Sequence, residues 1–174
     1  MVNTDYSIEE KIKERIVAGN WAYHVHKKLF SSKLISQNVE LKLCNSLIHS
    51  VTYASKTWVL KENMTNKLMS FEGKIMRKIF GPTRTDDGCW RIKANQEIND
   101  ILKGQDIIGF IKKQRLNWLG HVECMAEDNT VQKIKRWKPM SKRPIGRPKT
   151  HWVGDVLEDI KELKHMQLEE SSTE

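Results

Sequence analysis

Cysteine is scarce in this sequence, and no two cysteines have the close spacing of a metal knuckle or a redox pair. The three that occur, Cys44, Cys89 and Cys124, are odd in number and lie about 40 residues apart. A secreted disulfide framework needs an even set at short spacings, so this pattern indicates a reducing compartment.

Long apolar runs are also absent. The first ten residues, MVNTDYSIEE, have neither the basic start nor the apolar core of a signal peptide. No stretch approaches the ~18 consecutive apolar residues that a membrane-spanning helix needs. We therefore expect a soluble intracellular protein, in the nucleus or the cytoplasm, without a membrane partner.

Catalytic motifs are missing as well. There is no glycine-rich phosphate loop, no G-x-S-x-G and no H-E-x-x-H. The only adjacent aspartates, Asp86 and Asp87, have loop residues on both sides, without the strand that would present two carboxylates to Mg²⁺. His121 and Cys124 have the spacing of half a zinc site, but no second pair accompanies them. We expect no catalytic residue, no metal and no cofactor.

Strand signals are nearly absent, whereas apolar residues recur at helical spacing along most of the chain. The pattern predicts an all-α fold, an irregular bundle of about six to seven helices. The expected helices cover residues 8–30, 36–58, 65–79, 96–102, 106–125, 130–137 and 150–163.

Local signals refine this prediction. A capping box at residues 7–10 begins the first helix, and a short connection makes the first two helices an antiparallel hairpin. Gly81-Pro82 stops the third helix, Asp87-Gly88 forms a turn, and residues 90–92 form one short strand. We divide the chain into a helical region at 1–80, an irregular connector at 81–104, a C-terminal helical region at 105–164 and a disordered acidic tail at 165–174.

Positive charge is concentrated in one stretch, residues 133–152. From Lys133 to Lys149 there are eight Lys or Arg and no acidic residue, which equals the formal net charge of +8 for the whole chain. Three of the four prolines fall in the same stretch and favour extended backbone. We expect a stiff basic loop between two helices, whose default partner is a phosphate polymer, RNA or DNA.

Other interpretations of the basic residues stay open. Residues 143–149, R-P-I-G-R-P-K, are similar to an AT-hook, which enters the minor groove of A·T-rich DNA, although Ile145 stands where that motif prefers Arg. The stretch is otherwise a solvated basic loop. A second basic face, on the helix near residues 67–78, either contacts phosphate or is an ordinary solvated surface.

Several segments together resemble a known family. The segments are Arg115-Leu-Asn-Trp-Leu-Gly-His-Val, then Gly146-Arg-Pro-Lys-Thr-His-Trp152 with Asp155, and upstream residues 53–58, 71–81 and 87–92. They are similar to the C-terminal part of reverse transcriptases from non-LTR retrotransposons, the RTE-like LINE elements. The chain departs from the family at Lys56, where Glu is usual, and at Cys124, where Arg is usual.

The resemblance implies a thumb and C-terminal extension, with Met1 just past the polymerase palm. Such a part would clamp template–primer nucleic acid by backbone contacts, with the rest of a reverse transcriptase as a possible partner, and would not catalyse a reaction. A relic of a retrotransposon without a selected role is the alternative, and it would leave apolar helix faces exposed. The residues that we expect at the nucleic-acid surface are Lys112, Arg115, Trp118, His121, Lys133, Arg136, Lys142, Arg143, Arg147, Lys149 and Trp152.

Overall fold

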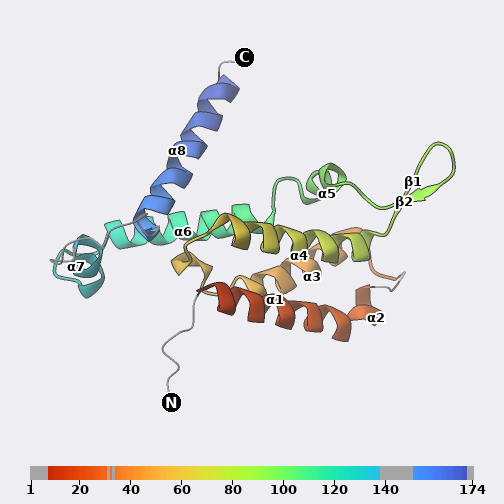
Figure 1. Cartoon of the computed structure of the whole chain (residues 1–174), viewed down its shortest axis with the longest axis horizontal. Helices are drawn as coiled ribbons and strands as arrows, with labels where there is room; N and C mark the ends of the chain where they lie inside the picture. The colour runs from red at the N-terminus through yellow and green to blue at the C-terminus, as the bar shows by residue number, and fades with distance from the viewer. Residues whose placement is uncertain (1–7, 31, 33, 138–150, 172–174) are drawn as a thin grey trace. The chain divides into compact units, whose positions relative to one another are not determined.

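The structure, a computed structural model, describes residues 8–30, 32, 34–137 and 151–171, with the backbone alone for Gln37 and residues 164–171. It is mostly helical, which confirms the all-α prediction (Figure 1). The elements within the described ranges are α1 (Ile8–Val25), α2 (Lys27–Phe30), α3 (Gln37–Val51), η1 (Ser55–Thr57), α4 (Glu62–Phe80), β1 (Thr83–Arg84), β2 (Trp90–Arg91), α5 (Asn95–Leu102), α6 (Ile107–Glu123), α7 (Thr130–Arg136) and α8 (Trp152–Ser171).

The chain forms two compact units. The first comprises Met1–Ala54 and Leu60–Ile111, and the second comprises Ser55–Val59 and Lys112–Glu174. The division falls within α6, so one helix contributes its first turn to one unit and the remainder to the other. The first unit thus includes residues 81–104 together with the first four helices.

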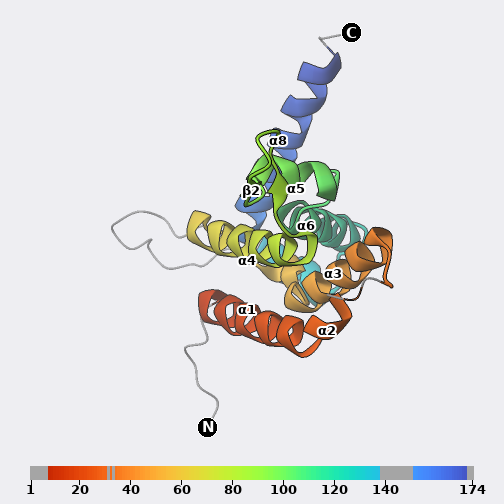
Figure 2. The ribbon, with the colours of Figure 1, turned by 90° about the vertical axis from the view of Figure 1, so that its right-hand side faces the viewer.

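The first unit is built on α1, α3 and α4, which lie side by side (Figures 1 and 2). The helices α1 and α3 run in opposite directions, as the predicted hairpin requires. Each contributes one apolar stripe to a common core, which includes Ile12, Tyr23, Cys44, Ile48, Val51, Leu68, Phe71 and Ile75. Burial of these stripes supplies the main stabilisation of the unit.

The helices expected at residues 8–30 and 36–58 both end earlier in the structure, with α1 at Val25 and α3 at Val51. The turn at His26 separates α1 from α2, and the bend lets Phe30 stack on Tyr23 with ring centroids 5.4 Å apart. Seven residues of straight helix would separate these rings by about 10 Å along the axis, so aromatic packing favours the bend. The end of α3 comes at Val51 rather than near Trp58, because Ala54 adopts φ +58°, which an α-helix cannot continue.

A close approach of three helices requires glycine at position 19. A Cβ atom on Gly19 would lie 2.6 Å from Cγ2 of Val51 on α3 and 2.8 Å from Cζ of Phe71 on α4. Both of these side chains are buried, so neither can move away without disturbing the core. Gly19 therefore sets how closely α1 packs against its two neighbours.

The connector after α4 is more ordered than the sequence suggested. Gly81, with φ +63°, ends α4 at the predicted stop, and Gly88, with φ +81°, makes the predicted turn. The expected strand at residues 90–92 is present as β2, and it pairs antiparallel with β1. Glu97 on α5 holds this hairpin, because its carboxylate binds the guanidinium of Arg91 at 2.8 Å and accepts the backbone N–H of Ala94.

A buried carboxyl group fixes the start of α6. Oε1 of Glu72, on α4, accepts the backbone N–H of Ile107 at 2.9 Å, and the Glu72 side chain is almost fully enclosed. Burial raises the pKa of Glu72 to about 7, the Ile107 hydrogen bond opposes this, and the charge of Asp106 adds to it. Glu72 thus joins α4 to the first turn of α6 inside the first unit.

The second unit packs α8 and α7 against the remainder of α6. Its apolar core includes Trp58, Leu119, Val122 and Val156. The helix α8 continues to Ser171, beyond the Lys164 at which the sequence predicted fraying. Residues 165–170 are Met, Gln, Leu and Glu apart from one His, which favour helix, and neither Pro nor Gly interrupts them. Ser7 of the predicted capping box and the last three residues lie outside the described ranges.

Replacing Gly19 with alanine tests the close approach. Alanine favours helix by about 1 kcal/mol over glycine, but the clash with Val51 and Phe71 outweighs this gain, so we expect Gly19→Ala to destabilise the chain by about 1–3 kcal/mol. Gly120→Ala is the control, because a Cβ at exposed Gly120 meets nothing within 4 Å, and we expect it to stabilise α6. Urea unfolding followed by circular dichroism measures both, and equal effects would refute the packing argument.

The pKa of Glu72 makes stability depend on pH. The folded chain binds this proton with a pKa of about 7 against an ordinary value of 4.5, so the free energy of unfolding falls as pH rises through this window. The variant Glu72→Gln keeps an acceptor for Ile107 but cannot ionise. As the pH rises from below 4.5 to above 7, the free energy of unfolding of the wild type should fall by roughly 3 kcal/mol relative to that of this variant. Denaturant titrations at several pH values measure the difference. Glu62→Gln, at an exposed site on α4, should not reproduce it.

Candidate nucleic-acid interface

The expected nucleic-acid surface lies in the second unit. Seven of its eleven residues fall within the described ranges, on α6, on α7 and at the first residue of α8. The other four, Lys142, Arg143, Arg147 and Lys149, lie in residues 138–150, outside the described ranges. The structure therefore bears on the two ends of the basic loop and on the helix that holds them.

Arg115 differs from the expectation that it faces a phosphate. Its residue surface is 0% exposed, and its guanidinium forms ion pairs with Asp155 at 2.5 Å and Asp159 at 3.2 Å. The reason is its register, since Arg115 continues the buried row of Ile107 and Ile111 at a spacing of four. Its charge is neutralised inside the protein, so we no longer count it among the phosphate contacts.

Lys112 lies one turn before Arg115 and also binds α8. Its Nζ is 3.2 Å from Asp159 and 2.7 Å from Glu162. Partial burial lowers the pKa of Lys112, but the hydrogen bonds and charges of Glu162 and Asp159 outweigh it and raise the pKa overall. Lys112 therefore stays protonated and links α6 to α8 through these ion pairs, which leaves it less available to a phosphate.

Trp118 and His121 remain at the surface, where a side chain from η1 joins them. Nζ of Lys56 lies 4.1 Å from the ring centroid of Trp118, at the distance of a cation–π interaction, and the ring of His121 is 5.5 Å from Trp118. Trp118 is half-buried and His121 is exposed. Lys56 therefore occupies a face of Trp118 that a base would need for stacking.

Both ends of the basic loop are anchored within the second unit. At the upstream end, Gln132 of α7 donates to the carbonyl of Val122 on α6, and Lys135 pairs with Glu123. At the downstream end, Nε1 of Trp152 donates to the carbonyl of Lys56 at 2.9 Å, beside the Arg115–Asp155 pair. The helix α6 is therefore the common support of the two ends.

The two cations on α7 from the predicted set are exposed. Arg136 pairs with Glu127 at 3.1 Å, where both side chains are open to solvent, so this pair contributes little and can exchange for a phosphate. Lys133 makes no ion pair with any described residue. Trp137, at the end of α7, is also exposed. Lys133 and Arg136 are therefore accessible members of the predicted surface, as His121 is on α6, and Trp137 lies next to them in the sequence.

Sequence reasoning missed a groove in the first unit. It lies between α1 and α4 and has a volume of about 700 Å³. Its polar lining carries three lysines and four neutral hydrogen-bonding side chains, namely Lys13, Lys67, Lys74, Asn20, Asn63, Asn66 and Ser70. The lining contains no carboxylate, and such a surface suits an anion. Only the lysines of α4 were visible as a basic face, because α1 supplies the opposite wall.

The groove is partly neutralised at one end. Glu9 lies 3.0 Å from Nζ of Lys67 and 3.6 Å from Nζ of Lys13. The hydrogen bond and charge of Lys67 lower the pKa of Glu9, so the carboxylate stays ionised and competes with an incoming phosphate. The other basic residues expected on α4 have different roles, because Arg77 donates to the carbonyl of Lys93 at 3.0 Å and Lys78 lies over the ring of Tyr23.

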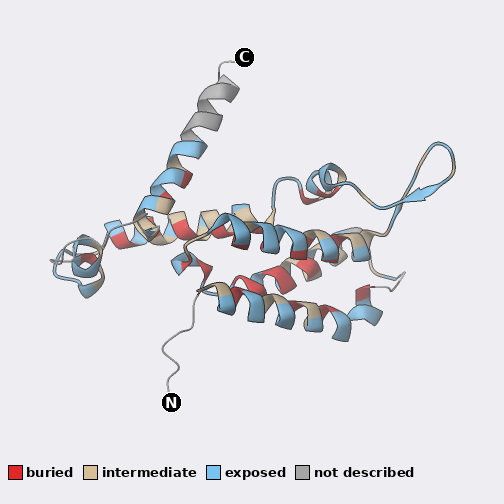
Figure 3. Ribbon diagram, in the orientation of Figure 1, coloured by how far each residue is buried: buried red, intermediate tan, exposed pale blue. Residues whose placement is uncertain are grey.

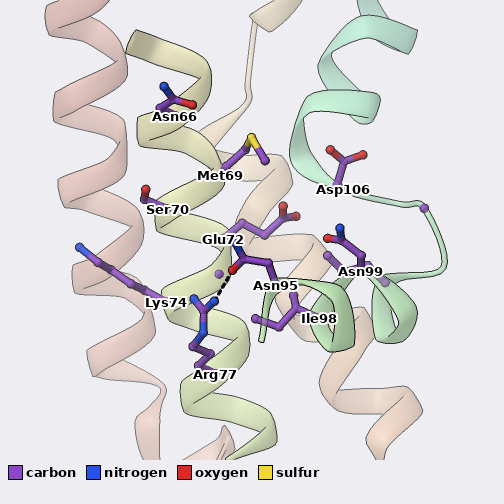
Figure 4. Close-up of a pocket in the computed structure, with 13 residues that line it drawn as sticks. Asn66, Met69, Ser70, Glu72, Lys74, Arg77, Asn95, Ile98, Asn99 and Asp106 are labelled. Atoms are coloured by element: carbon purple, nitrogen blue, oxygen red, sulfur yellow. Dashed lines mark hydrogen bonds between the residues drawn. The ribbon is translucent and has the colours of Figure 1, made fainter. Parts of the chain in front are cut away.

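A second pocket of about 700 Å³, between α4 and α5, has a mixed lining. Figure 4 shows the carboxyl group of Glu72 pointing from α4 toward the side where Asp106 and Asn99 lie. Arg77 lies farther along α4, bonded to Asn95. The two carboxyl groups oppose a polyanion, so the groove between α1 and α4 is the better phosphate site of the two.

Within the described residues, neither the Asp86-Asp87 pair nor the His121 and Cys124 pair belongs to a group of three or more possible metal ligands. Asp86 and Asp87 lie in the turn between β1 and β2. Within the ranges that the structure covers, no group of three or more His, Cys, Asp or Glu is arranged to hold a metal ion. Among the same residues, no helix combines the length and apolar character needed to cross a membrane.

Replacing Arg115 tests whether the buried ion pairs anchor α8. Arg115→Met leaves two largely enclosed carboxylates without their guanidinium, so we expect a loss of about 3–5 kcal/mol in the free energy of unfolding. Lys113→Met, at an exposed neighbouring site, should change stability by less than about 0.5 kcal/mol. Adding Asp155→Asn and Asp159→Asn to Arg115→Met should recover part of the loss. Denaturant unfolding measures all three, and no recovery would refute the charge argument.

Comparison with known proteins gives one distant similarity. The chain is 22% identical over 161 residues to an uncharacterized transposon-derived protein of Caenorhabditis elegans. The match covers 91% of this chain, and the chain spans about 57% of the length of that relative. No family model matches the chain, and no solved structure matches it. The similarity is consistent with a transposon origin.

Proposed function

We propose that this chain is the thumb and C-terminal part of a non-LTR, RTE-like reverse transcriptase, and that it grips template–primer nucleic acid through backbone phosphates. The proposal combines the sequence motifs that resemble this family with the transposon-derived character of the relative. In this role the chain positions a duplex and leaves bond formation to another part of the enzyme.

The observation that carries the proposal is the Arg115–Asp155 ion pair. Arg115 opens one of the two C-terminal motifs of the resemblance, and Asp155 closes the other, 40 residues later. Their side chains meet at 2.5 Å, so the two motifs form one structural unit with the basic loop between them. This arrangement explains why the family motif would need an arginine and an aspartate at these places.

The accessible cations support phosphate contacts. The groove between α1 and α4 offers Lys13, Lys67 and Lys74 without a carboxylate in its lining. Lys67 and Lys74 lie on one helix, seven residues apart, which corresponds to about 10 Å along the axis. That spacing equals about three base steps measured along the axis of a B-form duplex. Lys56 covers a face of Trp118, which favours phosphate contact over base stacking.

We infer no catalytic role for this chain. Its sequence holds no aromatic residue two positions before an Asp-Asp pair, which is the pattern that the resemblance implies for the polymerase site. The partner that fits is therefore RNA, DNA or their hybrid, together with a separate polymerase domain. A compartment that holds nucleic acid, the nucleus or the cytoplasm, follows from the same proposal.

Salt dependence tests the binding mode. If about five cations contact phosphates, log K should fall with log salt at a slope near −4 to −5. Replacing Lys13, Lys67 and Lys74 with Gln should weaken the slope by about 2–3. A control that replaces exposed Lys11, Lys42 and Lys103 removes the same net charge outside the groove and should leave the slope nearly unchanged. Fluorescence anisotropy with a labelled RNA–DNA hybrid measures each slope.

Two further variants sharpen the result. Glu9→Gln removes the competing carboxylate and should tighten binding severalfold at low salt. Replacing Lys142, Arg143, Arg147 and Lys149 with Gln measures the contribution of the basic loop. A slope near zero for the wild type would refute the clamp, and a strong preference for A·T-rich over G·C-rich duplex would favour the AT-hook interpretation instead.

A further inference from the structure

The groove between α1 and α4 presents neutral polar groups beside its lysines. These groups are Asn20 on α1 and Asn63, Asn66 and Ser70 on α4. Spacings of three and four residues place the three members on α4 in one row along that helix. In Figure 3 the ribbons of both helices carry the colour of exposed residues along much of their length. A ligand in the groove therefore meets positive charges and neutral hydrogen-bonding groups together.

The two walls of the groove run in the same direction, since the start of α1 contacts the first half of α4 and its end contacts the end of α4 (Figure 1). Lys13 and Lys67 therefore lie toward one end of the groove, where both contact Glu9. Asn20 follows Lys13 by two turns, which is about 10 Å along the axis. It lies toward the other end, where α4 carries Lys74. The groove thus offers positive charge toward both ends.

The side-chain amide of Asn20 has a defined orientation. Its Nδ2 donates to the backbone carbonyl of Ile16 at 2.9 Å, and the amide oxygen cannot take this place because two acceptors repel each other. No described residue donates a hydrogen bond to Oδ1 of Asn20. An oxygen acceptor repels the oxygens of a phosphate, whereas it accepts a hydrogen bond from a hydroxyl group. Oδ1 of Asn20 therefore suits a hydroxyl donor rather than an anion.

A ribose offers such a donor between two phosphates. The 2′-OH of RNA both donates and accepts hydrogen bonds, and it is the group by which a protein distinguishes RNA from DNA. The amides of Asn63 and Asn66 also donate and accept, and neither side chain is hydrogen-bonded to a described residue. Val17 lines the same groove, is 67% exposed, and offers apolar surface to the C–H groups of a sugar. The lining therefore matches a sugar–phosphate strand that carries 2′-hydroxyl groups.

We propose that this groove holds the RNA strand of a template–primer hybrid, and that Asn20 is a residue that determines specificity for ribose over deoxyribose. The inference rests on the proposed function, because the lysines of the groove must first bind the strand through its phosphates. Oδ1 of Asn20 then accepts a 2′-OH, and deoxyribose leaves this acceptor without a partner. The groove is open to water, so we expect a preference of about fivefold to tenfold, the size of one ordinary hydrogen bond.

Fluorescence anisotropy of the full chain with two hybrids that differ only in the 2′ group tests this assignment. One hybrid has an RNA strand, and in the other fluorine replaces each 2′-OH of that strand, which keeps the charge and the sugar pucker but removes the hydrogen-bond donor. At equal salt the wild type should bind the RNA hybrid about fivefold to tenfold more tightly. In Asn20→Ala this ratio should fall toward one. Asn45→Ala, at a half-buried site on α3 outside the groove, is the matched control and should keep the ratio of the wild type.

The ratio separates recognition of the hydroxyl from a structural effect. Alanine favours helix, so Asn20→Ala should keep the helical content of the wild type, which circular dichroism checks. If Asn20→Ala weakens both hybrids equally and leaves the ratio unchanged, Asn20 does not read the 2′-OH and the assignment is wrong. Equal affinity of the wild type for the two hybrids, with a salt slope near −4 to −5, would overturn this inference and leave the phosphate clamp standing. A wild type without salt-dependent binding would overturn both.

Discussion

The second unit depends on one buried cation. Arg115 lies inside the protein between Asp155 and Asp159, which are one turn apart on α8. Removing a guanidinium from water is costly, and the attraction of two carboxylates offsets that cost only when the geometry is right. Nε of Arg115 finds no hydrogen-bond partner in the described part of the chain, so the cluster is not optimised for stability alone. The cluster instead fixes the position of α8 along α6. An apolar contact allows two helices to slide, whereas a guanidinium held between two fixed carboxylates does not.

The same chemistry sorts the many cations of the chain into two groups. Lys112, Arg115 and Lys135 are matched by carboxylates on neighbouring elements and hold helices together. Among the described residues, the lysines of the groove between α1 and α4 have only Glu9 as an acidic partner, at one end. Net charge therefore overstates how much positive surface a phosphate polymer meets, and the position of each acid decides which cations remain. This explains why a basic composition points to a class of partner without locating the site.

Most of the helices, and the stop of α4, could be predicted from sequence, because apolar spacing and glycine act locally. Gly81 and Gly88 fall where the sequence placed a helix stop and a turn. The bend at His26 could not be predicted, since it depends on Phe30 meeting Tyr23. Arg115 carried a signal that was misinterpreted: it occupies a core position in the row of Ile107 and Ile111, but its partners on α8 are about 40 residues away and no local pattern identifies them. The groove was missed because its walls come from two helices about 50 residues apart.

Lys56 shows how one departure from the resembled family changes the surface without changing the support. Its backbone carbonyl accepts the indole N–H of Trp152, and this anchor does not depend on the side chain at position 56. Its ammonium group lies over Trp118, where the electron-rich ring attracts a cation. Glutamate, the usual residue of the family, would be repelled by that ring and would leave the aromatic face uncovered. Lysine therefore covers one aromatic face and adds one positive charge at the same place, and both changes support the phosphate contacts that we propose over contacts to bases.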